Sequence, residues 1–173
     1  MRTKAPKRRP HAHLLPTLFD RLRDEAPHRQ HEPAEAYTAT RMQMREIVQR
    51  DLTYLFNTTN REHEMERTYY PNVASSTLNY GMPSLAGGYL SEQKWADMAA
   101  VIRRAIVDFE PRLIADALTI SPVPERESRH HYNVLLFEIR GMIHMDPYPM
   151  AFTAHSAFDL ETNRMTMRFL DGA

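Results

Sequence analysis

The apolar positions of this chain follow two different periods, and the change falls near residue 110. Before it, apolar side chains recur every three or four residues, which places them on one face of a helix. After it, apolar and polar residues alternate, as in a strand with one buried face. Helices followed by strands are typical of an α+β fold. We therefore predict N-terminal helices followed by a small antiparallel sheet of three to four strands.

Two segments early in the chain have the helical period. The first, residues 15–22, is short, and its apolar residues share one stripe. The second, residues 40–56, has Thr40 as a predicted N-cap. We expect Glu46 and Arg50 to pair one turn apart on its exposed side. The apolar stripe of this second helix, interrupted only by Asp51, consists of Met44, Ile47, Val48, Leu52 and Leu55.

The third helix, residues 91–109, has the most regular pattern of the three. Ser91 is its predicted N-cap. Pro111 should end it, because the residue before a proline favours an extended backbone. Its stripe consists of Trp95, Met98, Ala99, Ile102, Ala105, Ile106 and Phe109.

Between the second and third helices the chain has the residues of tight turns. Asn79, Tyr80 and Gly81 form a predicted structural loop, and a proline and two more glycines follow within seven residues. We expect four apolar side chains to attach this loop to the core. These are Leu78, Tyr80, Met82 and Leu85.

The alternating part of the chain predicts four strands, within residues 115–123, 132–145, 148–160 and 165–170. Short turns, such as Asp146–Pro147, separate the later ones, so neighbouring strands should pair as an antiparallel meander with one buried face. The side chains expected on that face are Leu135, Phe137, Ile139, Ile143 and Met145 of one strand and Tyr148, Met150, Phe152, Ala154 and Phe158 of the next.

Composition adds a tail to this picture. The 173 residues include 22 basic and 22 acidic ones, but residues 1–13 hold five basic residues and no acid. We predict a flexible basic tail over residues 1–13 and one domain over 14–173. The tail could be solvated, or it could dock on an acidic surface or on nucleic acid. We expect neither a signal peptide nor a membrane span, since no apolar run is long enough.

Candidate chemistry is scarce. The chain has no cysteine, and its close histidine pairs lack a third ligand at helical spacing. It also has neither a G-x-S-x-G nucleophile motif nor a glycine-rich phosphate loop. We therefore predict no catalytic residue, no metal site and no cofactor.

The polar group Glu110, Pro111 and Arg112 stands where the third helix ends. As a catalytic acid Glu110 is a poor candidate, because a neighbouring guanidinium lowers the pKa of a carboxylate. Two interpretations remain open. The two charges could form a local ion pair that ends a helix, or both could face a partner chain and fix its register.

Several stretches together resemble one family, the gpW/gene-twenty-five-like baseplate wedge proteins of contractile phage tails. Within it, the resemblance is to the TssE-like baseplate subunits of type VI secretion systems. It covers roughly residues 14–170 and rests on the order and spacing of its parts. These are "LFDRL" (18–22), "RDLTYLFNTTN" (50–60), "YPNVASSTLNYGMPSL" (70–85), "FEPRL" (109–113) and "FDLETNRM" (158–165).

The resemblance implies a structural building block and no enzyme. TssE-like subunits join the wedge proteins TssF, TssG and TssK around the spike, in a cytoplasmic baseplate that docks at the inner-membrane complex and starts sheath assembly. Glu110, Pro111 and Arg112 match the family's Glu-Pro-Arg motif, which implies a partner-binding role. We expect this motif and an edge of the sheet to form the surface that contacts the sheath proteins. A peptidoglycan hydrolase, suggested by a lysozyme-related label in the family, and a nucleic-acid adaptor are the alternatives.

Overall fold

The computed structural model describes residues 16–23, 27–28, 39–84, 92–123 and 134–169. The basic tail, Ser91 and Leu85 therefore lie outside the described residues. The helices are α1 (Leu18–Leu22), α2 (Arg41–Phe56), α3 (Pro71–Ala74) and α4 (Glu92–Phe109), with short 3-10 turns η3 (Glu62–Glu64), η4 (Thr77–Asn79) and η5 (Ala115–Ala117). The strands are β1 (Thr119–Pro122), β2 (Val134–Ile143), β3 (Met150–Asp159) and β4 (Arg164–Phe169).

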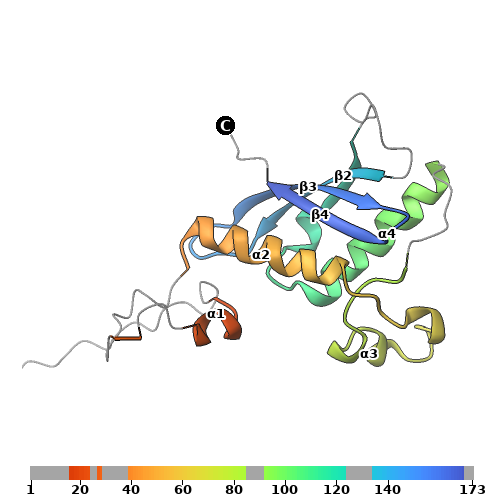
Figure 1. Cartoon of the computed structure of the whole chain (residues 1–173), viewed down its shortest axis with the longest axis horizontal. Coiled ribbons are helices and arrows are strands. Elements are labelled where there is room, and N and C mark those ends of the chain that lie inside the picture. Colours follow the sequence, from red (N-terminus) through yellow and green to blue (C-terminus); the bar gives the residue numbers. More distant parts are fainter. Residues whose placement is uncertain (1–15, 24–26, 29–38, 85–91, 124–133, 170–173) are drawn as a thin grey trace, which may run out of the picture.

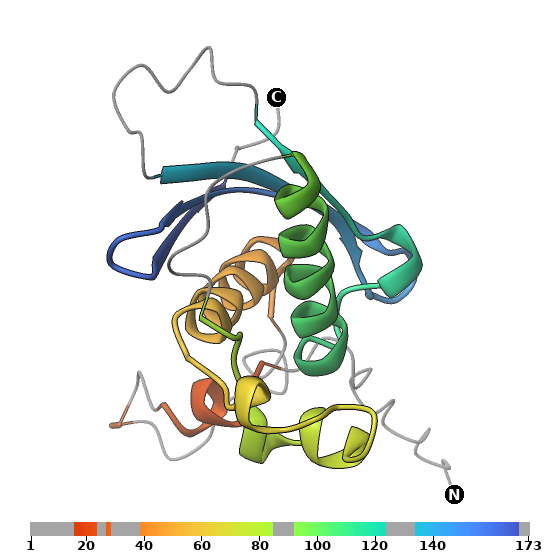
Figure 2. The same cartoon turned by 90° about the vertical axis from the view of Figure 1, so that its right-hand side faces the viewer.

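The four strands form one antiparallel sheet in the order β1-β2-β3-β4. This confirms the predicted α+β fold with its meander. Helices α2 and α4 lie side by side against one face of the sheet, and α3 lies on the side of these helices away from it (Figures 1 and 2). The core fills the layer between helices and sheet, where the largest buried side chains include Phe137, Phe152 and Phe158.

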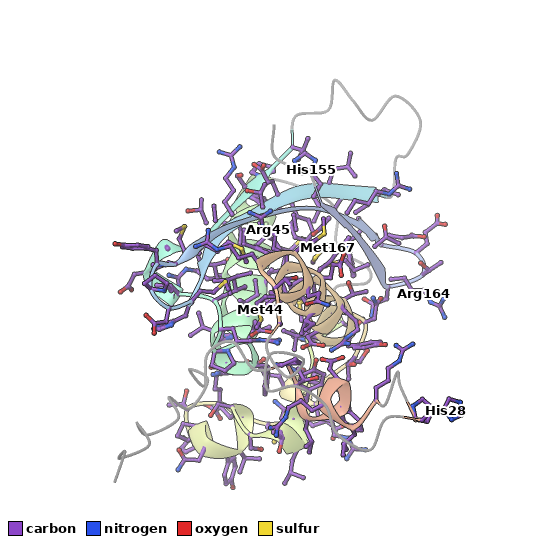
Figure 3. All side chains as sticks on the ribbon, turned by 90° about the vertical axis from the view of Figure 1, so that its left-hand side faces the viewer. His28, Met44, Arg45, His155, Arg164 and Met167 are labelled. Carbon is purple, nitrogen blue, oxygen red and sulfur yellow. The ribbon has the colours of Figure 1, made fainter. Side chains whose placement is uncertain are left out.

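The two long helices use the stripes that the sequence predicts. Thr40 caps α2 by accepting a hydrogen bond from the Gln43 backbone N–H, and the Gln43 side chain accepts one from the Thr40 N–H. This capping box satisfies two donors that the first turn would otherwise leave unpaired. Figure 3 shows Met167 of β4 on the face of the sheet toward α2, whereas His155 lies on the other face. Met44 of α2 is fully buried.

One predicted pair on α2 is wrong. Arg50 was expected to pair with Glu46, but it donates to Asp20, at 2.5 Å, and to Asp51, at 2.8 Å. Two carboxylates held near the guanidinium accept more hydrogen bonds from it than a single flexible glutamate on the helix surface could. The bond from Arg50 to Asp20 attaches α1 to α2. The apolar stripe of α1 is exposed.

Two apolar side chains that were predicted to be buried are exposed. Leu78 is 92% exposed, because the neighbouring Asn79 takes the inward position in η4 and is buried. Tyr148 is 72% exposed, since it lies in the turn before β3, where the alternation of faces has not begun. Met82 is buried and Tyr80 is packed against the core, as predicted.

The first strand is shorter than predicted. Ile114 donates to the Met142 carbonyl, and Val123 donates to the Leu136 carbonyl, so both ends of this segment run along β2. Between them η5 turns away from β2. The register against β2 therefore differs by three residues before and after η5, since Leu113 pairs with Ile143 but Thr119 pairs with Arg140. Only Thr119–Pro122 remains as β1. In the described part of the chain, no helix has the length and apolar content needed to cross a bilayer.

Candidate functional site

Helix α4 ends as its sequence dictates. Glu110 donates the last helical hydrogen bond, to the Ile106 carbonyl at 2.8 Å, and Pro111 has no N–H to continue it. The backbone then turns, and the Arg112 carbonyl accepts a bond from His144 just after β2. The corner formed by Glu110, Pro111 and Arg112 therefore joins the helical layer to the sheet.

The two charges of this corner bind each other. Arg112 donates to Glu110 from Nε, at 2.6 Å, from Nη2 and from its backbone N–H, and Nη2 also donates to Asp51 of α2, at 2.6 Å. Asp51 in turn accepts from Arg50, which binds Asp20. The local ion pair, one of the two interpretations that the sequence leaves open, is thus present, and it belongs to a network that links α4 to α2 and α1.

The hydrogen bonds of this network stabilise the charged forms of its side chains. Glu110 is only 3% exposed. Burial disfavours the charged form of Arg112, but its bonds to Glu110 and Asp51 outweigh burial and raise the pKa of Arg112 above its ordinary value. The hydrogen bond from Arg50 likewise lowers the pKa of Asp20 to about 2. The corner is therefore a fixed ion cluster, in which Glu110 accepts three bonds from Arg112.

The loop of Asn79, Tyr80 and Gly81 lies beside this cluster. The buried Asn79 side chain accepts from the Arg61 N–H, at 2.9 Å, and donates to the Ala74 carbonyl, at 3.0 Å. The Tyr80 hydroxyl donates to the Asp51 carbonyl at 3.4 Å, and its ring packs edge-on against Phe109, with centroids 5.4 Å apart. Burial, followed by the nearby charges of Asp51 and Glu110, raises the pKa of Tyr80.

Gly81 holds this loop against the end of α2. Its φ angle is +125°, a region that side chains with a Cβ rarely adopt. The Gly81 carbonyl accepts from the buried Asn60 side chain, and the following Met82 donates to the Thr58 carbonyl at 2.9 Å. Tyr80 therefore keeps its place beside Asp51 only while Gly81 keeps this conformation.

The outer edge of β4 is closed by side chains of α2 and of its C-cap residue, Asn57. The Asn57 amide donates to the Met165 carbonyl and accepts from the Met165 N–H, both at 2.9 Å. Gln49 donates to the Met167 carbonyl at 2.9 Å. Asn57 thus bonds to β4 as a neighbouring strand would. Nothing in the local sequence reveals this role of Asn57, because its partner Met165 is 108 residues away.

We expect Asn57→Asp to reduce the free energy of unfolding by about 1–2 kcal/mol, because the Met165 and Thr53 carbonyls lose their shared donor. Urea unfolding measures this loss. Asn72→Asp, the same change at an exposed position of α3, is the matched control and should change stability by less than about 0.5 kcal/mol. Equal losses in the two variants would contradict the closed edge.

The outer edge of β1 has a different character. Val123 and Leu136 form a hydrogen-bonded pair, so the alternation of an antiparallel ladder directs the backbone groups of Ile120 and Pro122 away from β2. Of these two, only Ile120 has an N–H to donate. No described strand lies against this edge. The described residues therefore offer one sheet edge for a further strand, and its donor is Ile120.

On the described residues, no group of three or more metal-binding side chains comes together. A second charged network, in which Arg67 binds Glu62 and Asp108 while Arg104 binds Glu62, attaches η3 to α4. It is a structural contact that sequence reasoning missed, because its members are up to 46 residues apart in the chain.

One comparison with known proteins gives a match. The model of the family described as "Baseplate wedge protein gp25" matches residues 42–148, which is more than half of the chain. The match begins in α2 and ends before β3, so it includes the corner at Glu110 and the strands β1 and β2. No curated protein and no solved structure matches the chain.

Proposed function

The chain belongs to the family of baseplate wedge protein gp25, and from this we propose that it is a TssE-like baseplate subunit of a type VI secretion apparatus. Membership gives it a structural role in the baseplate of a phage-tail-like contractile system. The observation that carries the proposal is the extent of the match, which spans the long helices, the corner and the edge strand.

The proposed partners are the wedge subunits TssF, TssG and TssK, together with the spike and the sheath proteins. The subunit would work in the cytoplasm, in a baseplate docked at the inner-membrane complex. It would bind its partners through surfaces that the fold holds rigid, because pre-organised groups lose little conformational freedom on binding.

The corner is the proposed contact for wedge subunits and, together with the sheet edge, for the sheath proteins. The members of the corner differ in exposure. Glu110 is buried and binds Arg112. Pro111 is exposed, and about a quarter of the Arg112 side chain is accessible. On the outer surface, a partner would therefore meet Pro111 and Arg112 before it meets Glu110. Such a fixed charge selects partners and sets their register more than it adds affinity.

The outer edge of β1 is the proposed contact for a sheath strand. A strand that adds to an exposed edge gains its affinity from main-chain hydrogen bonds. Closure of the β4 edge by Asn57 and Gln49 supports β1 as the edge in use. Pro122 limits the number of donors at this edge, which discourages indiscriminate pairing.

Peptidoglycan hydrolysis has no support in this geometry. A glycosidase needs two carboxyl groups across a cleft, one of them able to donate a proton. Glu110 and Asp51 are instead bridged by Arg112. Turnover of cell-wall material by the pure protein, lost in Glu110→Gln, would overturn this assignment.

The experiment that tests the proposal is complementation. In host cells that lack this gene, labelled sheath protein should stay diffuse, and the wild-type chain should restore assembled sheaths. Arg112→Lys keeps the charge but loses the paired hydrogen bonds, so it should restore fewer sheaths and co-purify less TssF and TssG. Normal sheath assembly without the gene would contradict the proposal.

A further inference from the structure

A cavity of about 200 Å³ lies beside the corner, between α2, the end of α4 and Tyr80. Sites for small molecules usually enclose about 300–1,000 Å³. This cavity is smaller, and its size suits a single inserted side chain better than a metabolite. Arg112, whose side chain is about a quarter accessible, is one of its lining residues, so a chain that docks at the corner lies beside the cavity.

The walls of the cavity are of two kinds. Leu52, Leu55, Phe109 and the ring of Tyr80 are apolar, while the remaining lining residues, Asp51, Glu110 and Arg112, are charged. Two carboxylates against one guanidinium leave one negative charge in excess. The next members of the network, Arg50 and Asp20, cancel each other and leave this excess unchanged.

Both carboxylates keep room for another donor. An ionised carboxylate accepts about four hydrogen bonds. Within the described part of the chain, Glu110 accepts three, all from Arg112, and Asp51 accepts two from Arg50 and one from Arg112. The spare positions are on Glu110 Oε2 and Asp51 Oδ2. Burial raises the pKa of Tyr80 most, the charges of Asp51 and Glu110 raise it further, and the charge of Arg112 lowers it.

We propose that this cavity receives the side chain of an arginine that a partner subunit inserts beside the corner. Its aliphatic stem would lie along the leucines, and its guanidinium would donate to Asp51 and Glu110 over the edge of Tyr80. Arginine fits better than lysine, because a planar guanidinium can donate to two acceptors at once and can stack on a ring. The identity of the partner rests on the proposed function. The binding of a guanidinium in the cavity does not.

The test uses the full chain and small probes. N-acetyl-arginine N-methylamide is titrated into the labelled protein, and NMR shifts of Tyr80, Phe109 and Arg112 are followed. The citrulline analogue, which has the same shape but no charge, should bind about fivefold more weakly. Equal binding of the two probes, stronger binding of the glutamate analogue, or no shifts at these residues would each overturn the proposal.

Two variants control for the place of binding. Leu55→Phe fills the cavity and should abolish the shifts, whereas Glu64→Gln removes an exposed carboxylate elsewhere and should leave them unchanged. If Leu55→Phe does not fold, Tyr80→Leu, which removes an aromatic wall, takes its place. Arginine binding that persists in the filled or opened variant would overturn the proposal.

Co-purification tests whether a partner subunit supplies the arginine. Leu55→Phe should lower co-purification of wedge subunits by about as much as it lowers probe binding. Loss of probe binding with unchanged co-purification would overturn the cavity as a partner contact while leaving the baseplate assignment in place. Failure of gene deletion to affect sheaths would overturn the baseplate assignment, whereas specific arginine binding would still support the chemistry of the cavity.

Discussion

Gly81→Ala should destabilise the fold by about 3 kcal/mol or more. A Cβ at this position would lie 2.3 Å from the Thr58 carbonyl oxygen, and the φ angle of +125° adds strain for any residue with a side chain. The clash is with backbone, which cannot turn aside. Relief would require breaking the bond between Thr58 and Met82, and Tyr80 would leave its place beside Asp51.

Gly141→Ala is the matched control. A Cβ there would meet the Leu118 side chain at 3.5 Å, which is an ordinary contact, and alanine costs less backbone entropy than glycine in a strand. Its stability should stay the same or rise slightly. Urea unfolding compares the two variants, and a Gly81→Ala protein as stable as Gly141→Ala would contradict the described turn.

Arg112→Ala should cost about 3 kcal/mol of stability, because it leaves Glu110 buried without a cation. Asp51 keeps its bond to Arg50, so the loss should come mainly from Glu110. Adding Glu110→Gln to Arg112→Ala should recover part of the loss, since a neutral amide is less costly to bury than a charge. Thermal or urea unfolding of the single and double variants measures this coupling.

Arg45→Ala is the control for removing an arginine. Arg45 is exposed on α2 (Figure 3), and its loss should change stability by less than about 0.5 kcal/mol. If Arg112→Ala were as mild as Arg45→Ala, or if the double variant were no better than the single one, the ion cluster would not have the energetic role assigned to it.

Local patterns predicted most of the fold. The stripes of α2 and α4, the capping residue Thr40 and the end of α4 before Pro111 depend on neighbouring residues, so the sequence contains the information directly. The failures have a common cause. Arg50 binds Asp20 and not Glu46, and Asn79 is buried in place of Leu78. The turn η5 shortens β1. Each of these outcomes depends on residues distant in the chain.

The same limit applies to the candidate site. The sequence identified the corner at Glu110 and Arg112 as an ion pair or a partner contact, but periodicity could not bring Asp51 to it across 61 residues. Nor could it tell one sheet edge from the other. The distinction comes from Asn57 and Gln49, whose side chains cover β4 and leave β1 as the described edge without a neighbour.

The central claim, that this subunit receives a sheath strand at β1, is tested most directly by Ile120→Pro compared with Ile120→Ala. Both shorten the packed side chain, but only proline removes the outward N–H, and Pro122 already occupies the equivalent position two residues later. Circular dichroism checks that both variants are folded, and labelled sheaths are counted in cells. We predict about tenfold fewer sheaths with Ile120→Pro than with Ile120→Ala. Equal sheath numbers in cells with the two folded variants would contradict the claim.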